Sequence, residues 1–569
     1  MQRRSPAARG RRTRLGVVLL TCLLAGCTAG PAAEEGALPL PATGRANPGR
    51  GTAVPARPVP ALPAPAFPTA GSVLPAVPPA ALATVSPLPL PAVAPAPAPG
   101  LPAPAAGPRP PSVVLVLTDD LSSDLLAAMP TVQQMQREGT SFSRYVVTDS
   151  LCCPSRASLF TGRFPHDTGV FTNVGRQGGF PVFRDRGEEF STFATDLQAA
   201  GYRTGMLGKY LNQYQPGGGS GQAPNYVPPG WDEWAVGGDA YPEFNYLLAT
   251  HRGLLSYGNA PQDYLTDVLA ARGERFIADA AAAARPFFLE VSTFAPHSPF
   301  VPAPRDAQSF QGAQAPRTPS FDVRSGPDAP RWLQGRAPRT AADIAVLDKD
   351  FRRREQSVQA VDALLARLRI VLAQTGRAQD TYVIFTSDNG FHLGQHRLMA
   401  GKNTAFDTDI RVPLVVTGPG VPAGADVGQL VSGVDVRPTL DEIAGVPAPP
   451  EVDGVSLLSL LRGQPPPTWR DAVLVEHNGP VVDRADPDLP ALGSGNPGSY
   501  VAIRTLAETW VEYADGEVEH YDIASDPDQL HPTASDVPLG RRAQLRATLA
   551  ALVACHGADS CWRAARLGR

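Results

Sequence analysis

The chain has 569 residues, of which 43% are hydrophobic, and its formal net charge is only −4. The apolar content is enough for a large buried core, and the length allows either several domains or one large α/β enzyme. The small net charge gives no general electrostatic reason to expect nucleic acid or an anionic membrane surface as a partner. Aromatic residues make up 7% while proline and glycine number 62 and 54, so we expect part of the chain to lie outside any packed core.

Residues 1–27 have the pattern of a secretory signal. The segment opens with basic residues: Arg3, Arg4, Arg9, Arg11, Arg12 and Arg14. An apolar run at residues 15–24 follows and is too short to cross a bilayer. The ending Leu24-Ala25-Gly26-Cys27 resembles a bacterial lipobox, in which the cysteine becomes the lipidated first residue. We therefore predict a lipoprotein signal peptide and an exported protein, lipid-anchored through Cys27 to the bacterial cell envelope. The alternative is an ordinary signal peptide with an incidental cysteine.

Residues 28–111 consist almost entirely of proline, alanine, glycine, valine and leucine. Such a segment cannot build a packed core and is expected to be extended, partly as polyproline II. We predict a disordered tether that holds the folded part away from a membrane or wall.

From Ser112 onward, short β-branched apolar runs alternate with helical patterns. We expect buried strands at residues 113–117, 204–207, 287–291, 382–385 and 413–416. We expect helices at residues 191–200, 264–284 and 347–374. This alternation predicts an α/β fold with a large, mostly parallel sheet sandwiched by helices.

Beyond Gly454 the pattern changes to short runs typical of antiparallel strands. We expect strands at residues 473–476, 500–503, 510–513 and 518–521, and a final helix at 543–554. The predicted organisation is therefore a catalytic domain over residues 112–453 and a smaller α+β subdomain over 454–569.

The cysteines divide into groups. Cys22 and Cys27 belong to the N-terminal segment, and Cys555 and Cys561 lie close together near the C-terminus. In an oxidising compartment that last pair could close a small disulfide loop, and the alternative is two free thiols. Cys152 and Cys153 are adjacent, a spacing at which cysteines rarely pair with each other.

Ionisable or metal-binding side chains follow four of the predicted strands. They occur in the segments Asp119-Asp120, Gly208-Lys209, Ala295-Pro296-His297 and Ser387-Asp388-Asn389-Gly390. Ligands of an open parallel sheet bind beyond the carboxyl ends of its strands, so we expect these segments to share one edge.

Three carboxylates and an amide among these residues offer only hard oxygen ligands: Asp119, Asp120, Asp388 and Asn389. Such a set favours Ca²⁺ or Mg²⁺ over zinc. Each pair alone has a structural explanation, because Asp-Asp can cap a helix and Asp-Asn-Gly is a good turn. Both pairs on one sheet edge favour a metal site.

The most specific stretch covers residues 150–163. It reads Ser150-Leu151-Cys152-Cys153-Pro154-Ser155-Arg156-Ala157-Ser158-Leu159-Phe160-Thr161-Gly162-Arg163. This run resembles the signature of the type I, formylglycine-dependent sulfatases of the alkaline phosphatase-like superfamily. A buried cysteine at a helix start would explain one residue but not the whole run.

The resemblance covers roughly residues 112–530. The strand-end segments occur in the family's order, and so does Lys402 ahead of Asp409-Ile410-Arg411-Val412-Pro413. Within the family, residues 151–156 and Gly208-Lys209-Tyr210-Leu211-Asn212 are most similar to the N-acetylglucosamine-6-sulfatase branch. The loop at residues 315–319 also resembles one in that branch.

The resemblance implies that Cys152 is oxidised to formylglycine by a formylglycine-generating enzyme before or during export. One hydroxyl of the hydrated aldehyde would attack sulfur and give a covalent sulfated intermediate. The second hydroxyl would then collapse to the aldehyde and expel sulfate. The implied substrate is a sulfated carbohydrate, with N-acetylglucosamine 6-sulfate as the preferred candidate.

The resemblance also assigns roles to the strand-end residues. The metal, Ca²⁺ first and Mg²⁺ as the alternative, would be held by the hydrate of residue 152 together with Asp119, Asp120, Asp388 and Asn389. Arg156 would hold that hydrate, and Lys209 and Lys402 would neutralise the sulfate oxygens. His297 would give a proton to the leaving oxygen. Without the surrounding motifs, Arg156, Lys209 and Lys402 would be interpreted as surface charges, and His297 as a structural residue.

One position departs from many sulfatases, which carry a second histidine where this chain has Leu211. The N-acetylglucosamine-6-sulfatase branch also lacks it, so the missing histidine indicates the branch of the family rather than a loss of activity. His392 and His396 are candidates for substrate contact, whereas His166 is expected to be structural. The segments 212–259 and 304–340 are expected to shape the substrate pocket, because specificity usually lies on loops.

Two other functions remain open from the sequence. A phosphodiester or phosphonate monoester hydrolase of the same superfamily would use the same metal site and nucleophile. A catalytically silent surface lipoprotein that binds sulfated glycans would keep Cys152 unmodified. A complete set of catalytic groups argues against the silent protein.

Overall fold

The computed structural model describes residues 110–219 and 221–568. The predicted signal peptide, with Cys27, lies outside these residues. So does the predicted tether, apart from Pro110 and Pro111.

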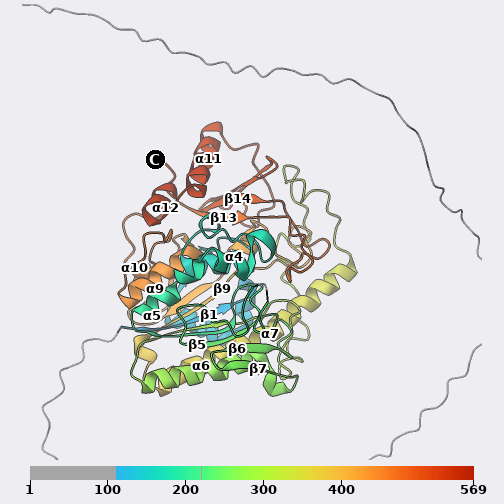
Figure 1. Ribbon diagram of the computed structural model, residues 1–569. Coiled ribbons are helices and arrows are strands. Elements are labelled where there is room, and N and C mark those ends of the chain that lie inside the picture. Colours follow the sequence, from blue (N-terminus) through green and yellow to red (C-terminus); the bar gives the residue numbers. More distant parts are fainter. Residues whose placement is uncertain (1–109, 220, 569) are drawn as a thin grey trace, which may run out of the picture. The chain divides into compact units, whose positions relative to one another are not determined.

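A ten-stranded sheet forms the centre of the fold, in the order β11-β2-β10-β9-β1-β8-β4-β5-β6-β7 (Figure 1). Its middle strands run parallel to one another and are β9 (Thr381–Ser387), β1 (Ser112–Thr118), β8 (Phe287–Ser292), β4 (Arg203–Lys209) and β5 (Glu233–Gly237). The large, mostly parallel sheet predicted from the sequence is confirmed.

Shorter strands complete both edges of this sheet. One edge holds β10 (Leu414–Thr417), β2 (Thr140–Phe142) and β11 (Ala425–Val427), and the other holds β6 (Leu247–Thr250) and β7 (Gly253–Ser256). The predicted strand at 413–416 is β10, which runs antiparallel to β9. Neither β5 nor the remaining edge strands were predicted, because runs of three to five residues carry too little alternation to be recognised.

Alternate residues of β1 face opposite layers of helices. Leu115 belongs to one apolar core, with α2 (Cys152–Thr161), α5 (Phe193–Ala199) and α9 (Val436–Ala444). Val114 belongs to the other, with α1 (Pro130–Glu138), α6 (Leu265–Ala282) and α7 (Ala341–Gln374). Figure 1 shows α6 and α7 on one side of the sheet and α5 and α9 on the other. Both faces of the sheet are therefore covered, as a parallel sheet requires.

The helix predicted at 347–374 begins earlier, at Ala341. Thr340 caps it, because its side chain accepts from the backbone N–H of Asp343 while the Asp343 carboxylate accepts from that of Thr340. This reciprocal capping box satisfies two N–H groups of the first turn and fixes the start of the helix.

The C-terminal region is a four-stranded antiparallel sheet with helices, as expected. It comprises β13 (Ala472–His477), β14 (Tyr500–Thr505), β15 (Glu508–Tyr513), β16 (Val518–Asp522), α11 (Leu539–Val553) and α12 (Ala558–Ala564). Val473 and Val475 face the core of α2, α5 and α9, whereas Leu474 faces the core of α11. A disulfide joins Cys555 to Cys561, and the thiols of Cys152 and Cys153 are free.

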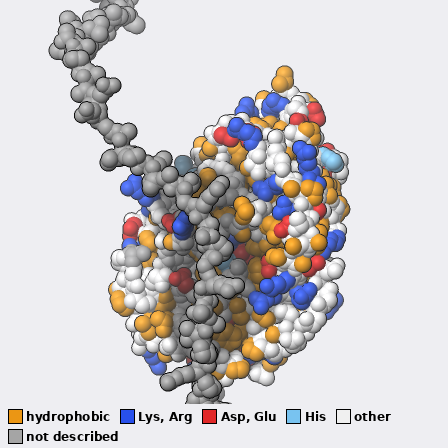
Figure 2. Space-filling model, turned by 90° about the vertical axis from the view of Figure 1, so that its right-hand side faces the viewer, with side chains coloured by type: hydrophobic (Ala, Val, Ile, Leu, Met, Phe, Trp, Pro, Cys, Tyr) orange, Lys and Arg blue, Asp and Glu red, His pale blue; other side chains and the backbone are white. Residues whose placement is uncertain are grey.

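Short elements fill the connections, among them α3 (Pro165–Thr168), α4 (Gly179–Asp185), α8 (Asp407–Ile410), α10 (Leu458–Leu461), β3 (Tyr145–Val146) and β12 (Val431–Ser432). On the face drawn in Figure 2, positive and negative side chains of the described residues are interspersed. This mixture agrees with the small net charge of the chain.

Candidate active site

The polar segments that follow the parallel strands meet at one edge of the sheet. Asp119 and Asp120 follow β1, which lies between β8 and β9. Asp388 follows β9, and its backbone N–H donates to Thr118 O at 3.1 Å. Lys209 ends β4, and His297 follows β8 after a short turn. The parallel register thus brings together side chains that are far apart in the sequence.

Cys152 is the first residue of α2 and is fully buried at the centre of this edge. Its Sγ lies 2.9 Å from Lys402 Nζ and 3.4 Å from Asp119 Oδ1. The next residue, Cys153, is held by its backbone N–H, which donates to Asn173 Oδ1 at 2.9 Å. The helix start therefore fixes residue 152 among groups of both charges.

An acidic cluster surrounds the thiol. Ligand atoms of Asp119, Asp120, Cys152 and His297 all lie within 4.8 Å of one another. Asn389 Nδ2 donates to Asp120 Oδ1 at 2.7 Å, whereas Asn389 Oδ1 is buried and has no hydrogen-bond partner among the described residues. A buried oxygen without a partner beside several carboxylates fits a bound cation. The cluster can therefore hold a divalent cation.

Buried cations balance these carboxylates. Lys209 Nζ contacts Asp119 Oδ2 at 2.5 Å, and Lys402 Nζ contacts Asp120 Oδ1 at 2.6 Å. Arg156 Nε donates to Asp388 Oδ2 at 2.7 Å. Burial alone would lower the pKa values of Lys209 and Lys402, but the neighbouring carboxylates outweigh burial and raise both. Both lysines are thus positively charged at neutral pH.

His297 is oriented by hydrogen bonds at both ring nitrogens. Nδ1 donates to the carbonyl of Ser298 at 2.7 Å, which leaves Nε2 pointing into the site. Burial lowers the pKa of His297, but Asp120, Asp119 and Asp488 outweigh it and raise the pKa to about 9. The ring therefore carries a proton that Nε2 can donate.

Comparison with known proteins identifies the family of the chain. A sequence model of the family described as Sulfatase matches residues 111–446. The Homo sapiens protein named N-acetylglucosamine-6-sulfatase is 35% identical over 480 residues, which cover 79% of this chain and 86% of that protein. This chain belongs to the sulfatase family. The predicted family is confirmed, and so is the likeness to that branch.

Solved structures agree on the fold of this sulfatase. The structure of BT4656 in complex with its substrate D-glucosamine-2-N,6-O-disulfate has a TM-score of 0.66 and 21% identity, and the match covers 78% of this chain and 97% of that one. The phosphonate monoester hydrolase of Agrobacterium radiobacter has a TM-score of 0.59 and 24% identity, with 78% and 96% covered. The sulfatase thus has the alkaline phosphatase-like fold that the resemblance implied.

The predicted localisation is wrong. The matching relatives include sulfatases of Homo sapiens, Capra hircus and Bos taurus, and proteins of Caenorhabditis elegans and Drosophila melanogaster whose names describe extracellular sulfatases. These relatives are not bacterial lipid-anchored proteins. Basic residues, a short apolar run and small residues before a cysteine do not by themselves define a lipid anchor. Among the described residues, no helix is long and apolar enough to cross a membrane.

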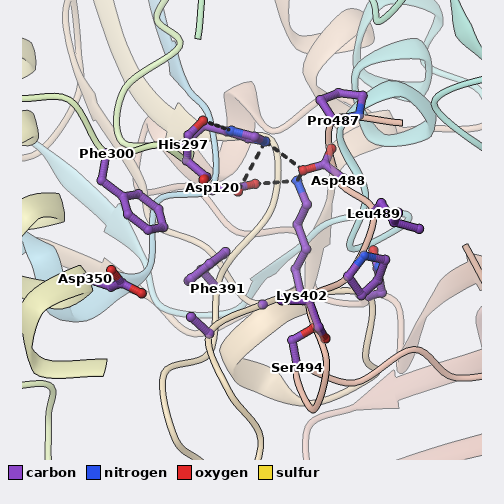
Figure 3. Close-up of a pocket in the computed structure, with 16 residues that line it drawn as sticks. Asp120, His297, Phe300, Asp350, Phe391, Lys402, Pro487, Asp488, Leu489 and Ser494 are labelled. Atoms are coloured by element: carbon purple, nitrogen blue, oxygen red, sulfur yellow. Dashed lines mark hydrogen bonds and ion pairs between the residues drawn. The ribbon is translucent and has the colours of Figure 1, made fainter. Parts of the chain in front are cut away.

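Asp488 is the site residue that the sequence did not reveal. It lies between β13 and β14, 336 positions from Cys152, yet its Oδ2 is 3.2 Å from Cys152 Sγ. Its Oδ1 lies 2.7 Å from His297 Nε2 and 2.9 Å from Lys402 Nζ (Figure 3). The surrounding segment is rich in aspartate and proline and carries no motif. No local pattern could have identified this residue.

A cavity of about 200 Å³ opens onto the site (Figure 3). Its lining includes Asp120, His297, Phe300, Lys402, Asp488 and Leu489. The predicted loop at 304–340 does not contribute to this lining, nor does the segment 212–259. The walls of the cavity come instead from the residues after β8, the region around Lys402 and the loop between β13 and β14.

Arg354 of α7 contacts the backbone of the site at Asp120. Its Nη2 donates to the carbonyl of Asp120 at 2.6 Å, and its guanidinium lies 4.2 Å from the centre of the Phe391 ring. Asp120 has a φ of 63°, which is uncommon for a residue other than glycine. A buried charge-assisted hydrogen bond to its carbonyl therefore helps to hold Asp120 in this conformation.

The two histidines predicted as candidates for substrate contact, His392 and His396, have structural partners. His392 Nδ1 contacts Asp409 at 2.9 Å and its Nε2 donates to Ser494 O at 2.6 Å, so both nitrogens are occupied. His396 is buried and stacks on Phe406, with 3.9 Å between ring centres. Neither is among the residues that line the cavity. Leu211, at the departure from many sulfatases, is buried in the core.

His166 is structural, as expected. Its ligand atoms lie close to those of Asp167 and His556, which makes a second group of possible metal ligands. However, His166 Nδ1 contacts Glu476 at 2.8 Å and Nε2 contacts the carbonyl of Cys555 at 2.9 Å. Both nitrogens are therefore used to join α3 to the C-terminal region.

Proposed function

We propose that this sulfatase removes sulfate from a 6-O-sulfated glucosamine unit of a carbohydrate. Its 35% identity to a protein named N-acetylglucosamine-6-sulfatase, over most of both chains, is the observation that carries the substrate class. The name of a second relative, from Capra hircus and 36% identical, is the same. The fold of BT4656, whose substrate is D-glucosamine-2-N,6-O-disulfate, is in agreement.

The proposed nucleophile is formylglycine at position 152, made from cysteine by a formylglycine-generating enzyme. Burial, followed by the charges of Asp119 and Asp488, raises the pKa of the Cys152 thiol well above its usual value. A protonated thiol is a weak nucleophile, so the encoded side chain is poorly suited to attack sulfur. Cys152 has no exposed surface in the folded chain. A modifying enzyme would therefore have to reach it before folding is complete.

The proposed cofactor is Ca²⁺, with Mg²⁺ as the alternative. Its ligands would be residue 152 and the oxygens of Asp119, Asp120, Asp388 and Asn389. All-oxygen sets of this kind suit hard cations. When bound, the cation would polarise a sulfate oxygen and favour the ionised form of a hydroxyl at position 152.

The remaining side chains have matching roles in this proposal. Lys209 and Lys402 would bind the sulfate oxygens, because both are buried cations beside Cys152. His297 Nε2 would give its proton to the departing sugar oxygen. Arg156 Nη2 is buried without a partner in the described part of the chain, so it is free to donate to a hydroxyl at position 152.

The mass of the tryptic peptide that contains Cys152 tests the nucleophile. Conversion to formylglycine replaces sulfur and two hydrogens with one oxygen, and we expect this change in protein from its native host. Cys152→Ala should lower kcat/KM for a 6-sulfated glucosamine by roughly a thousandfold or more, as removal of a nucleophile does. The neighbouring Cys153→Ala variant is the matched control and should retain conversion and most activity. Unmodified cysteine in active protein would contradict the mechanism.

A panel of matched sulfate, phosphate and phosphonate esters of one alcohol tests the substrate class. A phosphonate monoester hydrolase shares the fold, so the fold does not separate these activities. We expect kcat/KM to be highest for the sulfate ester. A preference for the phosphonate would favour the alternative function, and binding without turnover would favour a silent glycan-binding protein.

A further inference from the structure

The Asp488 carboxylate lies where an anionic group of the substrate would have to bind. Its Oδ1 contacts both His297 Nε2 and Lys402 Nζ, and its Oδ2 contacts Cys152 Sγ and, at 2.7 Å, Asn173 Nδ2. Its side chain is 4% exposed. In Figure 3 the carboxylate points at the same nitrogen atoms that face the cavity. The carboxylate thus satisfies donors that the proposed function assigns to the sulfate ester.

Two anions cannot share these donors at low cost. Like charges a few ångströms apart in a buried site repel strongly. His297 Nε2 carries a single proton, which already faces Asp488 Oδ1 at 2.7 Å and cannot be donated to a second anion in the same geometry. A sulfate group that reaches Cys152 and these two cations must therefore displace Asp488. This step rests on the proposed function, in which the same cations bind sulfate.

The segment that carries Asp488 is suited to such a movement. It is anchored at its base, where Asn496 exchanges hydrogen bonds of 2.7 and 2.8 Å with the backbone of Val481. The carbonyls of Gly493 and Ser494 are also held, by the Met399 backbone N–H at 2.9 Å and His392 Nε2 at 2.6 Å. Between these residues, Leu492 is fully exposed and Leu489 is 42% exposed. An irregular loop with unburied apolar side chains loses little packing when it shifts. Asp486, on the same loop, also faces inward, and its carboxylate accepts from Asn173 Nδ2 at 3.0 Å. A shift of the loop would therefore also break this contact.

We propose that Asp488 occupies the sulfate subsite as an internal competitor, which the substrate displaces by moving the loop at residues 482–492, between these anchors. In the empty enzyme the carboxylate keeps Lys402 and His297 in place. When it returns after hydrolysis, it competes with the product sulfate for the same donors and promotes its release. Asp488 therefore weakens the binding of both the substrate and the product sulfate, and it speeds release of the product.

Binding of inorganic sulfate to the purified enzyme with its cation tests this proposal. We would measure its dissociation constant by calorimetry and its inhibition constant against a 6-sulfated glucosamine. Asp488→Asn keeps the size of the side chain but removes the competing charge. Loss of a charge-assisted contact of this kind is expected to tighten sulfate binding by roughly tenfold. The inhibition constant should fall by the same factor.

Asp483→Asn is the matched control, because Asp483 lies on the same loop and is exposed to solvent. It removes the same charge without touching the site, so sulfate affinity should change by less than about twofold at physiological salt. Thermal unfolding of both variants shows whether they fold. If a folded Asp488→Asn enzyme binds sulfate as weakly as the wild type or more weakly, the proposal is overturned.

The two proposals fail in different ways. Sulfate binding needs no turnover, so tighter binding by Asp488→Asn together with unmodified Cys152 would support the role of Asp488 and reject the proposed nucleophile. If residue 152 is formylglycine but Asp488→Asn binds sulfate no more tightly than the wild type, the proposed nucleophile is supported and the role of Asp488 is rejected.

Discussion

Asn389 shows at the scale of one residue why the site fits a cation. Its Nδ2 is bonded to Asp120, but its Oδ1 is buried without a partner in the described residues. Leaving a buried polar atom unpaired costs about 1–3 kcal/mol, so its retention here needs a reason. A bound divalent cation would supply the missing partner and offset the repulsion among the carboxylates of Asp119, Asp120 and Asp388.

Replacing Asn389 with alanine is therefore expected to weaken cation binding. Saturating Ca²⁺ should raise the melting temperature of the wild-type protein, because a ligand that binds only the folded state stabilises it. In Asn389→Ala the Ca²⁺ affinity should fall by about tenfold or more, since one ligand is lost. Calorimetric titration of the chelator-treated proteins measures both affinities. An equal Ca²⁺ affinity in wild type and variant would exclude Asn389 as a ligand.

At the scale of elements, α3 ties the catalytic core to the C-terminal helices. His166 of α3 contacts Glu476 of β13 and the carbonyl of Cys555, which precedes α12. Burial lowers the pKa of His166, but the hydrogen bond and charge of Glu476 outweigh it and raise the pKa to about 9. The folded state thus binds a proton more tightly than the unfolded chain does. This difference stabilises the fold when His166 is protonated.

The stabilisation by His166 should depend on pH. It should be fully present below the unfolded pKa of about 6.5 and lost as the pH rises through about 9. His166→Gln should therefore lower the free energy of unfolding by about 2 kcal/mol near pH 6 and by much less near pH 10. Denaturant unfolding at several pH values measures the difference. His556→Gln changes an exposed neighbour that contacts Asp167 and is the matched control. A loss of stability in His166→Gln that does not depend on pH would contradict the assignment.

At the scale of the molecule, the two predicted subdomains share a core. We propose residues 112–453 and 454–569 as parts of one cooperative unit, because Val473, Val475 and Tyr500 pack in the same apolar cluster as Leu115. The C-terminal part also supplies Asp488 to the site. Separating the parts would expose this cluster to water, at a cost of about 25 cal/mol per Å² of apolar surface.

We therefore expect a single thermal transition for the protein, seen at the same temperature by calorimetry and by loss of activity. A fragment ending near Asp453 should fail to fold, because one side of its core would be uncovered. Its far-ultraviolet circular dichroism and solubility would show this. Two separate transitions, or a folded fragment, would show that the subdomains are independent.

Much of this protein could be predicted from its sequence because the relevant signals are local. Buried strands such as β1 and β9 are continuous β-branched runs, and a polar segment at each carboxyl end placed Asp119 and Asp388 at one edge. The fixed spacing at residues 150–163 identified the family. The N-terminal pattern was local too, but it did not determine an anchor, because several kinds of export signal share it.

Only the tertiary structure decided which distant segments complete the site. Asp488 enters from a loop without any motif, and Arg354 reaches Asp120 from the middle of a long helix. The edge strands β6, β7 and β11 are likewise fixed by pairing with a neighbour rather than by their own residues. The sequence by itself determined four of the five parallel central strands, the signature around Cys152 and the polar strand ends, since each depends on neighbouring residues. Contacts across hundreds of residues depend on how the whole chain packs, and no local pattern records them.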